Sequence, residues 1–227
     1  MSMPKSAEEA YREGTDYQFD QTELALGPWT SYSLVHDPKH MAFVLARYKF
    51  VAKMLDGKKN VFEIGGGDGF GLPLVAQHVD HLYCIDWDER LLEGNKRRLS
   101  HLTNVNYLHM DLNKAKPEVT ADAVYTVDVI EHLEPEKEDA FVENMVACLA
   151  PDGVLITGTP NVAAEAYQSE RSRVQHINLK SMKELRELMS RYFENVFMFG
   201  MNDEVLHTGY APMCHYIWSV AVGKKHR

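Results

Sequence analysis

The sequence of 227 residues contains only three cysteines, Cys84, Cys148 and Cys214. Their odd number, their wide separation and the lack of a CxxC pair argue against a disulfide framework. A chain of this length buries roughly 70% of the surface that its unfolded form exposes, so it needs no cross-link to fold. We therefore expect three reduced thiols and a cytoplasmic location.

Long apolar runs and an excess of basic residues are also missing. No run approaches the roughly 18 apolar residues that span a bilayer, and residues 1–20 are polar and acidic, unlike a secretory signal. The 24 Lys and Arg residues against 33 Asp and Glu residues give a net charge of −9. This charge repels a polyanion unless a basic patch overrides it. The short basic groups at 96–98 and 224–227 are typical of a helix end and a tail, so we expect neither a nucleic acid nor a membrane as partner.

The chain has no internal repeat and no low-complexity linker. Residues 1–57 are predicted to be a helical extension that acts as a lid. This extension holds an aromatic stretch at 27–32 and a helical pattern at 39–55, where Phe43, Ala46 and Phe50 recur at helical spacing. Residues 58–227 are predicted to form the main domain.

From Asn60 onward, short apolar runs alternate with longer amphipathic ones, which is typical of repeated βα units. The predicted strands cover residues 60–64, 81–85, 105–109, 123–127, 154–157, 196–200 and 215–222, and the predicted helices cover residues 71–79, 90–100, 137–149 and 181–192. Near-continuous apolar strands predict a parallel sheet that is covered on both faces. The last two runs lack a helix between them. We therefore predict an α/β, doubly wound, mostly parallel seven-stranded sheet with an antiparallel last strand.

A glycine-rich turn directly follows the first predicted strand. Its glycines, Gly65, Gly67 and Gly69 among them, do not fit the G-x-G-x-x-G/A frame that binds a dinucleotide pyrophosphate. The carboxylate of Glu63 precedes the turn, where it would repel a phosphate and suit an ammonium group. The turn therefore predicts a ligand at the end of this strand that is not a dinucleotide.

The next two strands also end in carboxylates. Asp86 follows the second strand, where an acidic residue takes ribose hydroxyls in nucleotide-binding folds, and Asp111 follows the third, where it could accept from an adenine amino group. Both residues could instead cap the helices or turns that follow them. Trp87 is either a wall of the adenine pocket or a core residue.

These features together resemble the class I S-adenosylmethionine-dependent methyltransferases. The segments Asp128-Val129-Ile130-Glu131-His132-Leu133 and 149–155 are similar to those of small-molecule O-methyltransferases related to ubiquinone biosynthesis. The resemblance covers residues 60–161 and implies a Rossmann-like methyltransferase fold, with S-adenosylmethionine as donor and S-adenosylhomocysteine as product. It assigns Glu63, Gly65, Gly67 and Gly69 to the methionine part, Asp86 to the ribose and Asp111 to the adenine, with Trp87, Leu112 and Asp128 beside them in the donor site.

Methyl transfer to a hydroxyl needs the acceptor held about 3 Å from the methyl carbon and a base for its proton. His132 follows the fourth strand, and imidazole is a side chain suited to proton transfer at neutral pH, so it is the first candidate, although it could also cap the next turn. Arg47 could pair with the donor carboxylate or form an ordinary surface salt bridge.

The C-terminal part is predicted to choose the acceptor, because polar residues are dense around its last strands. The acceptor-site candidates are His176, Asn202, Asp203 and Glu204, with His207 as a second candidate base. A solvated loop is the alternative for each of them. Asp203, Glu204, His207 and His215 match no standard metal spacing, so no metal is expected.

The sequence thus predicts a methyltransferase that acts on a small polar metabolite at a hydroxyl, of the sugar or sugar-nucleotide type. An N- or carboxyl-methyltransferase of a small metabolite remains open, as does a regulatory protein that binds the donor without catalysis. A nicotinamide-dependent oxidoreductase is disfavoured by Glu63 and by the glycine frame. The oligomeric state is open, with a homodimer as one option.

Overall fold

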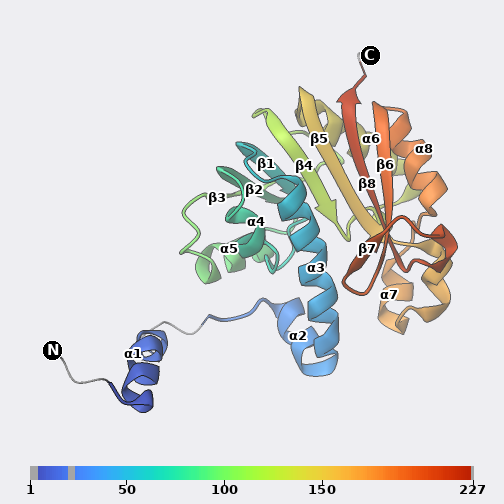
Figure 1. Ribbon diagram of the computed structural model, residues 1–227. Coiled ribbons are helices and arrows are strands. Elements are labelled where there is room, and N and C mark those ends of the chain that lie inside the picture. Colours follow the sequence, from blue (N-terminus) through green and yellow to red (C-terminus); the bar gives the residue numbers. More distant parts are fainter. Residues whose placement is uncertain (1–4, 20–23, 226–227) are drawn as a thin grey trace.

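The computed structural model describes residues 5–19 and 24–225 and is built around one eight-stranded sheet (Figure 1). The strands are β1 (Asn60–Ile64), β2 (His81–Asp86), β3 (Val105–His109), β4 (Ala121–Val127), β5 (Leu149–Pro160), β6 (Phe193–Asn202), β7 (Val205–His207) and β8 (Tyr216–Lys224). Their order is β3-β2-β1-β4-β5-β8-β6-β7. β1 to β5 are parallel, while β8 is antiparallel to both β5 and β6. The predicted α/β doubly wound fold is confirmed.

Among the eight strands of the described sheet, β7 was not predicted. β7 pairs antiparallel with the end of β6, with Asn202 opposite Val205 and Gly200 opposite His207. Asp203 adopts a positive φ of 50° in the turn between them, a conformation that Asp tolerates better than most residues. The polar stretch that was expected to be a loop is therefore a short hairpin.

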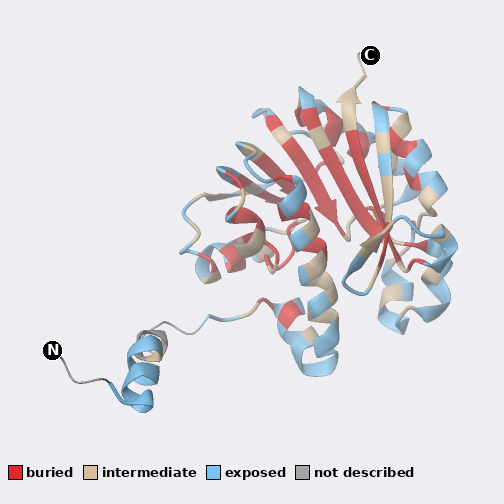
Figure 2. Cartoon of the chain, in the orientation of Figure 1, coloured by how far each residue is buried: buried red, intermediate tan, exposed pale blue. Residues whose placement is uncertain are grey.

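Helices cover both faces of the sheet. The α-helices of the described residues are α1 (Ala7–Phe19), α2 (Pro28–His36), α3 (Pro38–Met54), α4 (Leu72–Ala76), α5 (Glu89–Arg98), α6 (Glu138–Cys148), α7 (Glu170–Gln175) and α8 (Met182–Ser190). The short 3₁₀ segments are η1 (Ile130–His132), η2 (Pro135–Lys137), η3 (Val162–Tyr167) and η4 (Ala211–Met213). Figure 2 shows the central strands buried along most of their length, as expected for a sheet covered on both sides.

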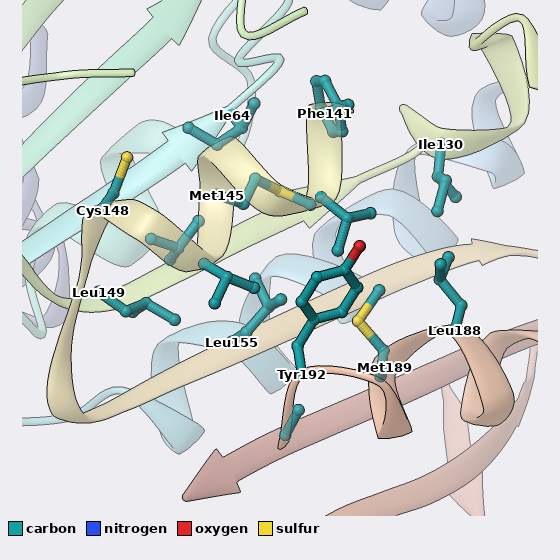
Figure 3. Close-up of a cluster of buried hydrophobic side chains, with 14 of the residues drawn as sticks. Ile64, Ile130, Phe141, Met145, Cys148, Leu149, Leu155, Leu188, Met189 and Tyr192 are labelled. Atoms are coloured by element: carbon teal, nitrogen blue, oxygen red, sulfur yellow. The ribbon is translucent and has the colours of Figure 1, made fainter. Parts of the chain in front are cut away.

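One apolar cluster packs α6 and α8 against the sheet (Figure 3). Met145 and Phe141 come from α6, Leu188 and Met189 come from α8, and Leu155 comes from β5. A second cluster packs α3, α4 and α5 against the opposite face. Because side chains alternate between faces along a strand, the position of a residue in its strand decides which cluster it joins.

The N-terminal extension does not behave as one unit. α3 belongs to the second core cluster, where Val51, Ala52 and Leu55 are fully buried, while residues 7–14 of α1 are exposed and α1 stands apart from the sheet in Figure 1. Whether α2 acts as a lid stays a prediction.

No helix in the described part of the chain is both long and apolar enough to cross a bilayer. All three cysteines are buried and unpaired.

Candidate functional site

A cavity of about 1320 Å³ lies at the carboxyl ends of the first four strands. Its floor is formed by residues 64, 65 and 67 after β1, residues 85–88 at the end of β2, residues 110–113 after β3, and Asp128 and Val129 after β4. Ligands of open α/β sheets bind at this edge, where the strand order reverses between β1 and β4. The volume exceeds the roughly 300–1,000 Å³ of a typical small-molecule pocket, so two ligands can lie side by side.

The glycine turn brings the backbone to the cavity surface. Gly65 and Gly67 line the cavity with positive φ angles of 78° and 53°. A Cβ atom on Gly65 would lie 2.3 Å from Val129, and one on Gly67 would lie 2.8 Å from Trp29. Gly69 does not line the cavity, because it faces α5 instead, where a Cβ atom would meet Asn95 at 2.9 Å. The turn therefore presents bare backbone at positions 65 and 67 to the cavity, packed against Val129 and Trp29, and we call this surface the glycine cradle.

Gly65→Ala is expected to destabilise the protein more than Gly57→Ala does. Both glycines have a φ near 77°, at 78° and 77°, so both variants carry the roughly 1–2 kcal/mol cost of a left-handed non-glycine residue. A Cβ atom on Gly65 would also collide with Val129, whereas nothing lies within 4 Å of a Cβ atom on Gly57. The difference in the free energy of unfolding, measured by denaturant titration, isolates this contact. Equal losses in the two variants would contradict the described turn.

Asp86 lies at the cavity wall with both carboxylate oxygens oriented by the backbone. Oδ2 accepts a hydrogen bond from the Gly67 N–H at 3.0 Å, and Oδ1 accepts one from the Asp88 N–H at 2.9 Å. Burial raises the pKa of Asp86, and these hydrogen bonds counteract part of that effect. Each oxygen keeps a free lone pair, so the carboxylate can still accept from two ligand hydroxyls. Trp87 also lines the cavity and is 69% exposed, so it is not a core residue.

Asp111 and Leu112 extend the same wall. Asp111 is held by Asn113 and Lys114, with Oδ1 accepting from the Asn113 N–H at 2.9 Å and Oδ2 lying 2.9 Å from the Lys114 Nζ. Burial acts to raise the pKa of Asp111, but the hydrogen bonds from Lys114 and Asn113 outweigh it and leave the pKa below its usual value. Leu112 is 3% exposed and supplies an apolar surface beside Asp111.

Glu63 does not lie at the cavity surface as predicted. It is 1% exposed and is absent from the cavity lining. Its position in β1 puts it on the same face of the sheet as Val61, beneath α3, where Tyr48 and Tyr125 surround it. Burial raises the pKa of Glu63 to about 7, although these two hydroxyls act to lower it. Glu63 is therefore a buried side chain of β1, and its assignment to the methionine part stays a prediction.

Arg47 pairs with Asp128 in a buried contact. The distance between Arg47 Nη1 and Asp128 Oδ2 is 2.6 Å, and the guanidinium lies 3.9 Å above the centre of the Tyr216 ring. Burial alone would lower the pKa of Arg47, but the charge of Asp128 outweighs it, so Arg47 stays charged. Arg47 is buried and does not line the cavity, so the alternative of a surface salt bridge is wrong, while its pairing with the donor carboxylate stays a prediction. Asp128 does line the cavity, and its Oδ1 has no hydrogen-bond partner.

His132 lies at the far end of the cavity, in η1 after β4. Its Nδ1 is 3.0 Å from the Gln175 carbonyl oxygen. Because a carbonyl can only accept, Nδ1 carries the proton and Nε2 of the neutral ring presents a lone pair. Glu131 is fully buried beside it and accepts a hydrogen bond from the Thr159 hydroxyl at 2.9 Å. Burial raises the pKa of Glu131, and the charge of Asp128 raises it further.

His176 joins this end of the site from a distant part of the sequence. Its ring packs against that of His132, with 5.0 Å between the ring centres. Burial lowers the pKa of His176, and His132 lowers it further. The Asn178 N–H donates to the Glu131 carbonyl at 3.0 Å and fixes this segment to η1. The structure therefore brings His176 next to His132.

None of the predicted acceptor residues lines the cavity, His176 included. Asn202, Asp203, Glu204 and His207 form the β6–β7 hairpin. His207 Nδ1 accepts from the Gly209 N–H at 3.0 Å, and Nε2 lies 2.9 Å from the Asn202 side-chain oxygen. The structure thus places His207 outside the cavity with both ring nitrogens engaged, and this position does not support a role as the second base.

The wall opposite the strand ends was predicted in part. It consists of Trp29, Tyr32, Ser33 and His36 from α2, which belong to the extension predicted to act as a lid, and of Tyr167, Gln168, Ser169, Arg171, Ser172 and Gln175 from residues 167–175, which were not predicted. Figure 1 shows α2 and α7 below the sheet, at the end toward which β4 points. Arg171 lies 5.4 Å from the Tyr32 ring and links the two segments. The dense polar run at 168–175, directly after the fifth strand, is the signal that could have identified this wall.

Three comparisons place the chain among known proteins. Residues 62–155 match the family described as "Methyltransferase domain". A protein of Mycolicibacterium smegmatis described as a "probable S-adenosylmethionine-dependent methyltransferase" is 31% identical over 104 residues, which cover 45% of this chain and 38% of that protein. A ubiquinone biosynthesis O-methyltransferase of Rickettsia canadensis is 26% identical over 111 residues, which cover 48% of this chain and 46% of that enzyme.

A solved structure extends the similarity to most of the chain. The N-methyltransferase NodS of Bradyrhizobium japonicum, in complex with S-adenosylhomocysteine, superposes with a TM-score of 0.61 over 93% of this chain and 97% of that chain, at 16% identity. This likeness concerns the fold. The aligned segments cover less than half of the two curated relatives. Residues 62–155 are therefore similar to a methyltransferase domain, and the chain shares the α/β fold of this solved methyltransferase.

Proposed function

We propose that this protein is an S-adenosylmethionine-dependent methyltransferase of a small, hydroxylated metabolite. The observation that carries the proposal is Asp86, whose carboxylate is held by the Gly67 N–H at the edge of a glycine cradle. In this fold the nucleoside part of a ligand lies at that edge. The match of residues 62–155 to a methyltransferase domain supports the same conclusion.

The residues present fit the donor. The cavity beside Gly65 and Gly67 is proposed to hold the methionine part, with Asp86 accepting from the ribose and with Asp111 and Trp87 lining the place of the adenine. Asp128 also lines the cavity and is the proposed partner of the donor ammonium group. When bound, S-adenosylmethionine supplies a methyl group on a positively charged sulfur.

His132 is the proposed catalytic residue. Its Nε2 presents a lone pair because Nδ1 is fixed by the Gln175 carbonyl, so Nε2 is the atom that acts on the acceptor hydroxyl. The carbonyl also holds the ring in one orientation, and a fixed geometry of this kind lowers the barrier of an in-line transfer. Residues of α2 and α7 line the same cavity as His132 and so border the proposed acceptor position.

The acceptor is proposed to be a sugar or sugar-nucleotide type of metabolite. Five polar side chains of one wall, Gln168, Ser169, Arg171, Ser172 and Gln175, border the cavity between His132 and solvent. Such a surface suits a ligand with several hydroxyl groups. Exposed Tyr167 and Tyr32, at 89% and 53% exposure, offer flat surfaces for sugar rings. An amine acceptor, as the name of NodS states for that protein, is the alternative.

Calorimetric titration with S-adenosylhomocysteine, alongside NAD⁺, tests the donor. We expect one S-adenosylhomocysteine per chain and no heat from NAD⁺. The second step measures S-adenosylhomocysteine release from S-adenosylmethionine with a panel of sugars, sugar nucleotides and amines. His132→Gln is expected to retain donor binding and to lose at least about 100-fold in rate, the lower range for a removed acid–base group. A folded protein that binds NAD⁺ and not S-adenosylhomocysteine would overturn the proposal.

A further inference from the structure

We propose that Arg171 and Gln168 bind an anionic group of the acceptor, a phosphate or a carboxylate, at the cavity wall formed by residues 167–175. Both side chains line the cavity. A guanidinium binds such groups strongly, because two parallel N–H donors match two anionic oxygens. The inference rests on the proposed function and narrows its substrate class to metabolites that carry a negative charge beside the methylated hydroxyl.

Arg171 is a charged residue of the cavity lining that lacks a counter-charge. Five of the six acidic side chains that line the cavity are already paired with a basic side chain, namely Asp37, Asp88, Asp111, Asp128 and Glu134. The other lining cation, Lys137, is the partner of Glu134. The guanidinium of Arg171 lies 5.4 Å from the centre of the Tyr32 ring, and it forms no ion pair or hydrogen bond within residues 5–19 and 24–225.

These pairings allow an anion into a cavity whose lining is acidic. Six carboxylates and two cations would repel a negative charge if each acted alone. The paired carboxylates are largely neutralised by their partners, and the sixth, Asp86, accepts the backbone N–H groups of Gly67 and Asp88. Among the residues of the 167–175 wall that line the cavity, the remaining charge is therefore that of Arg171, and it attracts an anionic ligand.

Gln168 gives this wall a second polar group without a partner. Its Oε1 and Nε2 atoms are both buried, and neither has a hydrogen-bond partner in the described part of the chain. Buried polar atoms without partners are costly and call for an explanation. The Ser169 hydroxyl accepts from the Ser172 N–H at 3.1 Å and caps the start of α7, so Gln168 lies just before the helix and Arg171 lies in its first turn. An anionic oxygen beside Arg171 would accept a hydrogen bond from Gln168 Nε2.

Helix α7 connects this anion site to the reacting end of the cavity. Arg171, Ser172 and Gln175 line the cavity, whereas residues 173 and 174 do not, so one face of α7 borders the ligand. The Gln175 carbonyl holds His132 Nδ1 at 3.0 Å. Four helical residues span about 6 Å, which puts the anionic group roughly one helical turn from Gln175. We therefore expect the acceptor to carry its anionic group close to the methylated hydroxyl and not at a distant end of the molecule.

Anion titration of the full chain tests the site without any assay of activity. The protein is titrated with inorganic phosphate and, separately, with acetate at constant ionic strength, and the side-chain N–H signals of its arginines are followed by NMR. The signal that is absent from Arg171→Gln identifies Arg171. We expect this signal to shift to saturation, and the anion that binds more tightly distinguishes a phosphate from a carboxylate. A shift that does not saturate with either anion overturns the site.

Arg173→Gln is the matched control for Arg171→Gln. Arg173 lies on the same helix and is exposed, but it does not line the cavity, so its N–H signal should not saturate with either anion. Arg171→Gln should raise the KM for a phosphorylated or carboxylated acceptor at least about 10-fold, since one hydrogen bond to a charged group contributes about that factor. It should leave the affinity for S-adenosylhomocysteine unchanged. Arg173→Gln should change neither quantity.

Matched acceptors make the kinetic result specific to charge. Each sugar of the panel is offered as the neutral sugar, as its phosphate and as its uronic acid. We expect the charged forms to be preferred at least about 10-fold in kcat/KM, and this preference should be lost in Arg171→Gln and kept in Arg173→Gln. Equal use of neutral and charged forms by the wild type overturns the anion site alone. Saturable anion binding at Arg171 in a folded protein that does not bind S-adenosylhomocysteine rejects only the proposed function.

Discussion

Asp86→Ala is expected to weaken S-adenosylhomocysteine binding at least about 100-fold, because two hydrogen bonds to a charged group contribute roughly 1.5–3 kcal/mol each. The substitution removes the proposed ribose ligand. It also leaves the Gly67 N–H, which Asp86 holds at 3.0 Å, without its acceptor, so the glycine cradle loses an anchor. Calorimetry of the variant against the wild type measures the effect.

Two further variants separate recognition of the donor from stability of the fold. Asp122→Ala removes a carboxylate that accepts the Asn60 N–H at 2.9 Å, at the opposite end of β1 from the cavity, and should leave donor affinity unchanged. Asp86→Asn keeps an oxygen that can accept from Gly67 and should bind more tightly than Asp86→Ala. Donor affinity of Asp86→Ala within about threefold of the wild type, a difference of roughly 0.7 kcal/mol, would remove Asp86 from the site.

Arg47→Met is expected to lower the free energy of unfolding by about 3 kcal/mol, as removal of one partner from a buried ion pair does. Asp128 would lose its ion pair in a half-buried position, and the stacking of the guanidinium on Tyr216 would be lost with it. Methionine retains most of the aliphatic bulk of arginine, so the charge is the main change. Denaturant titration followed by circular dichroism measures the loss.

Lys96→Met is the matched control for Arg47→Met. Lys96 forms an ion pair with Glu93 at 2.7 Å, but these side chains are 49% and 51% exposed, and such surface pairs contribute at most about 1 kcal/mol. Similar losses in the two variants would mean that the Arg47–Asp128 pair is no more important than a surface pair. A smaller loss in Arg47→Met at high salt than at low salt would also contradict its burial, because salt screens exposed charges.

Much of the fold could be predicted because its signals are local. The predicted strands at 60–64 and 105–109 coincide with β1 and β3; β1 is buried along most of its length, as a near-continuous apolar run indicates, while β3 is the partly exposed edge strand. The predicted helix at 39–55 is found as α3 at Pro38–Met54. The hairpin at residues 202–207 was not predicted, because a polar stretch between strands is equally typical of a loop and of a tight turn.

The candidate site, like the fold, could be predicted only in part. Asp86 and Asp111 could be located from the sequence, because parallel strands end at one edge of the sheet and the residue after each strand is near that edge. Glu63 pairs with Cys84 in the register of β1 and β2, two positions before Asp86, so it lies within the buried part of the sheet and not at its edge. A shift of two positions along the strand therefore decides between a cavity wall and a buried side chain.

The sequence by itself determined the order of strands and helices, the glycine turn and the carboxylates at the strand ends, because each of these depends on neighbouring residues. Only the tertiary structure decided which distant polar groups meet. Arg47 reaches Asp128 across β4, and His176 reaches His132 because the segment after α7 returns to η1. These pairings depend on how helices cross the sheet and on which face each side chain takes, and no spacing in the sequence records either.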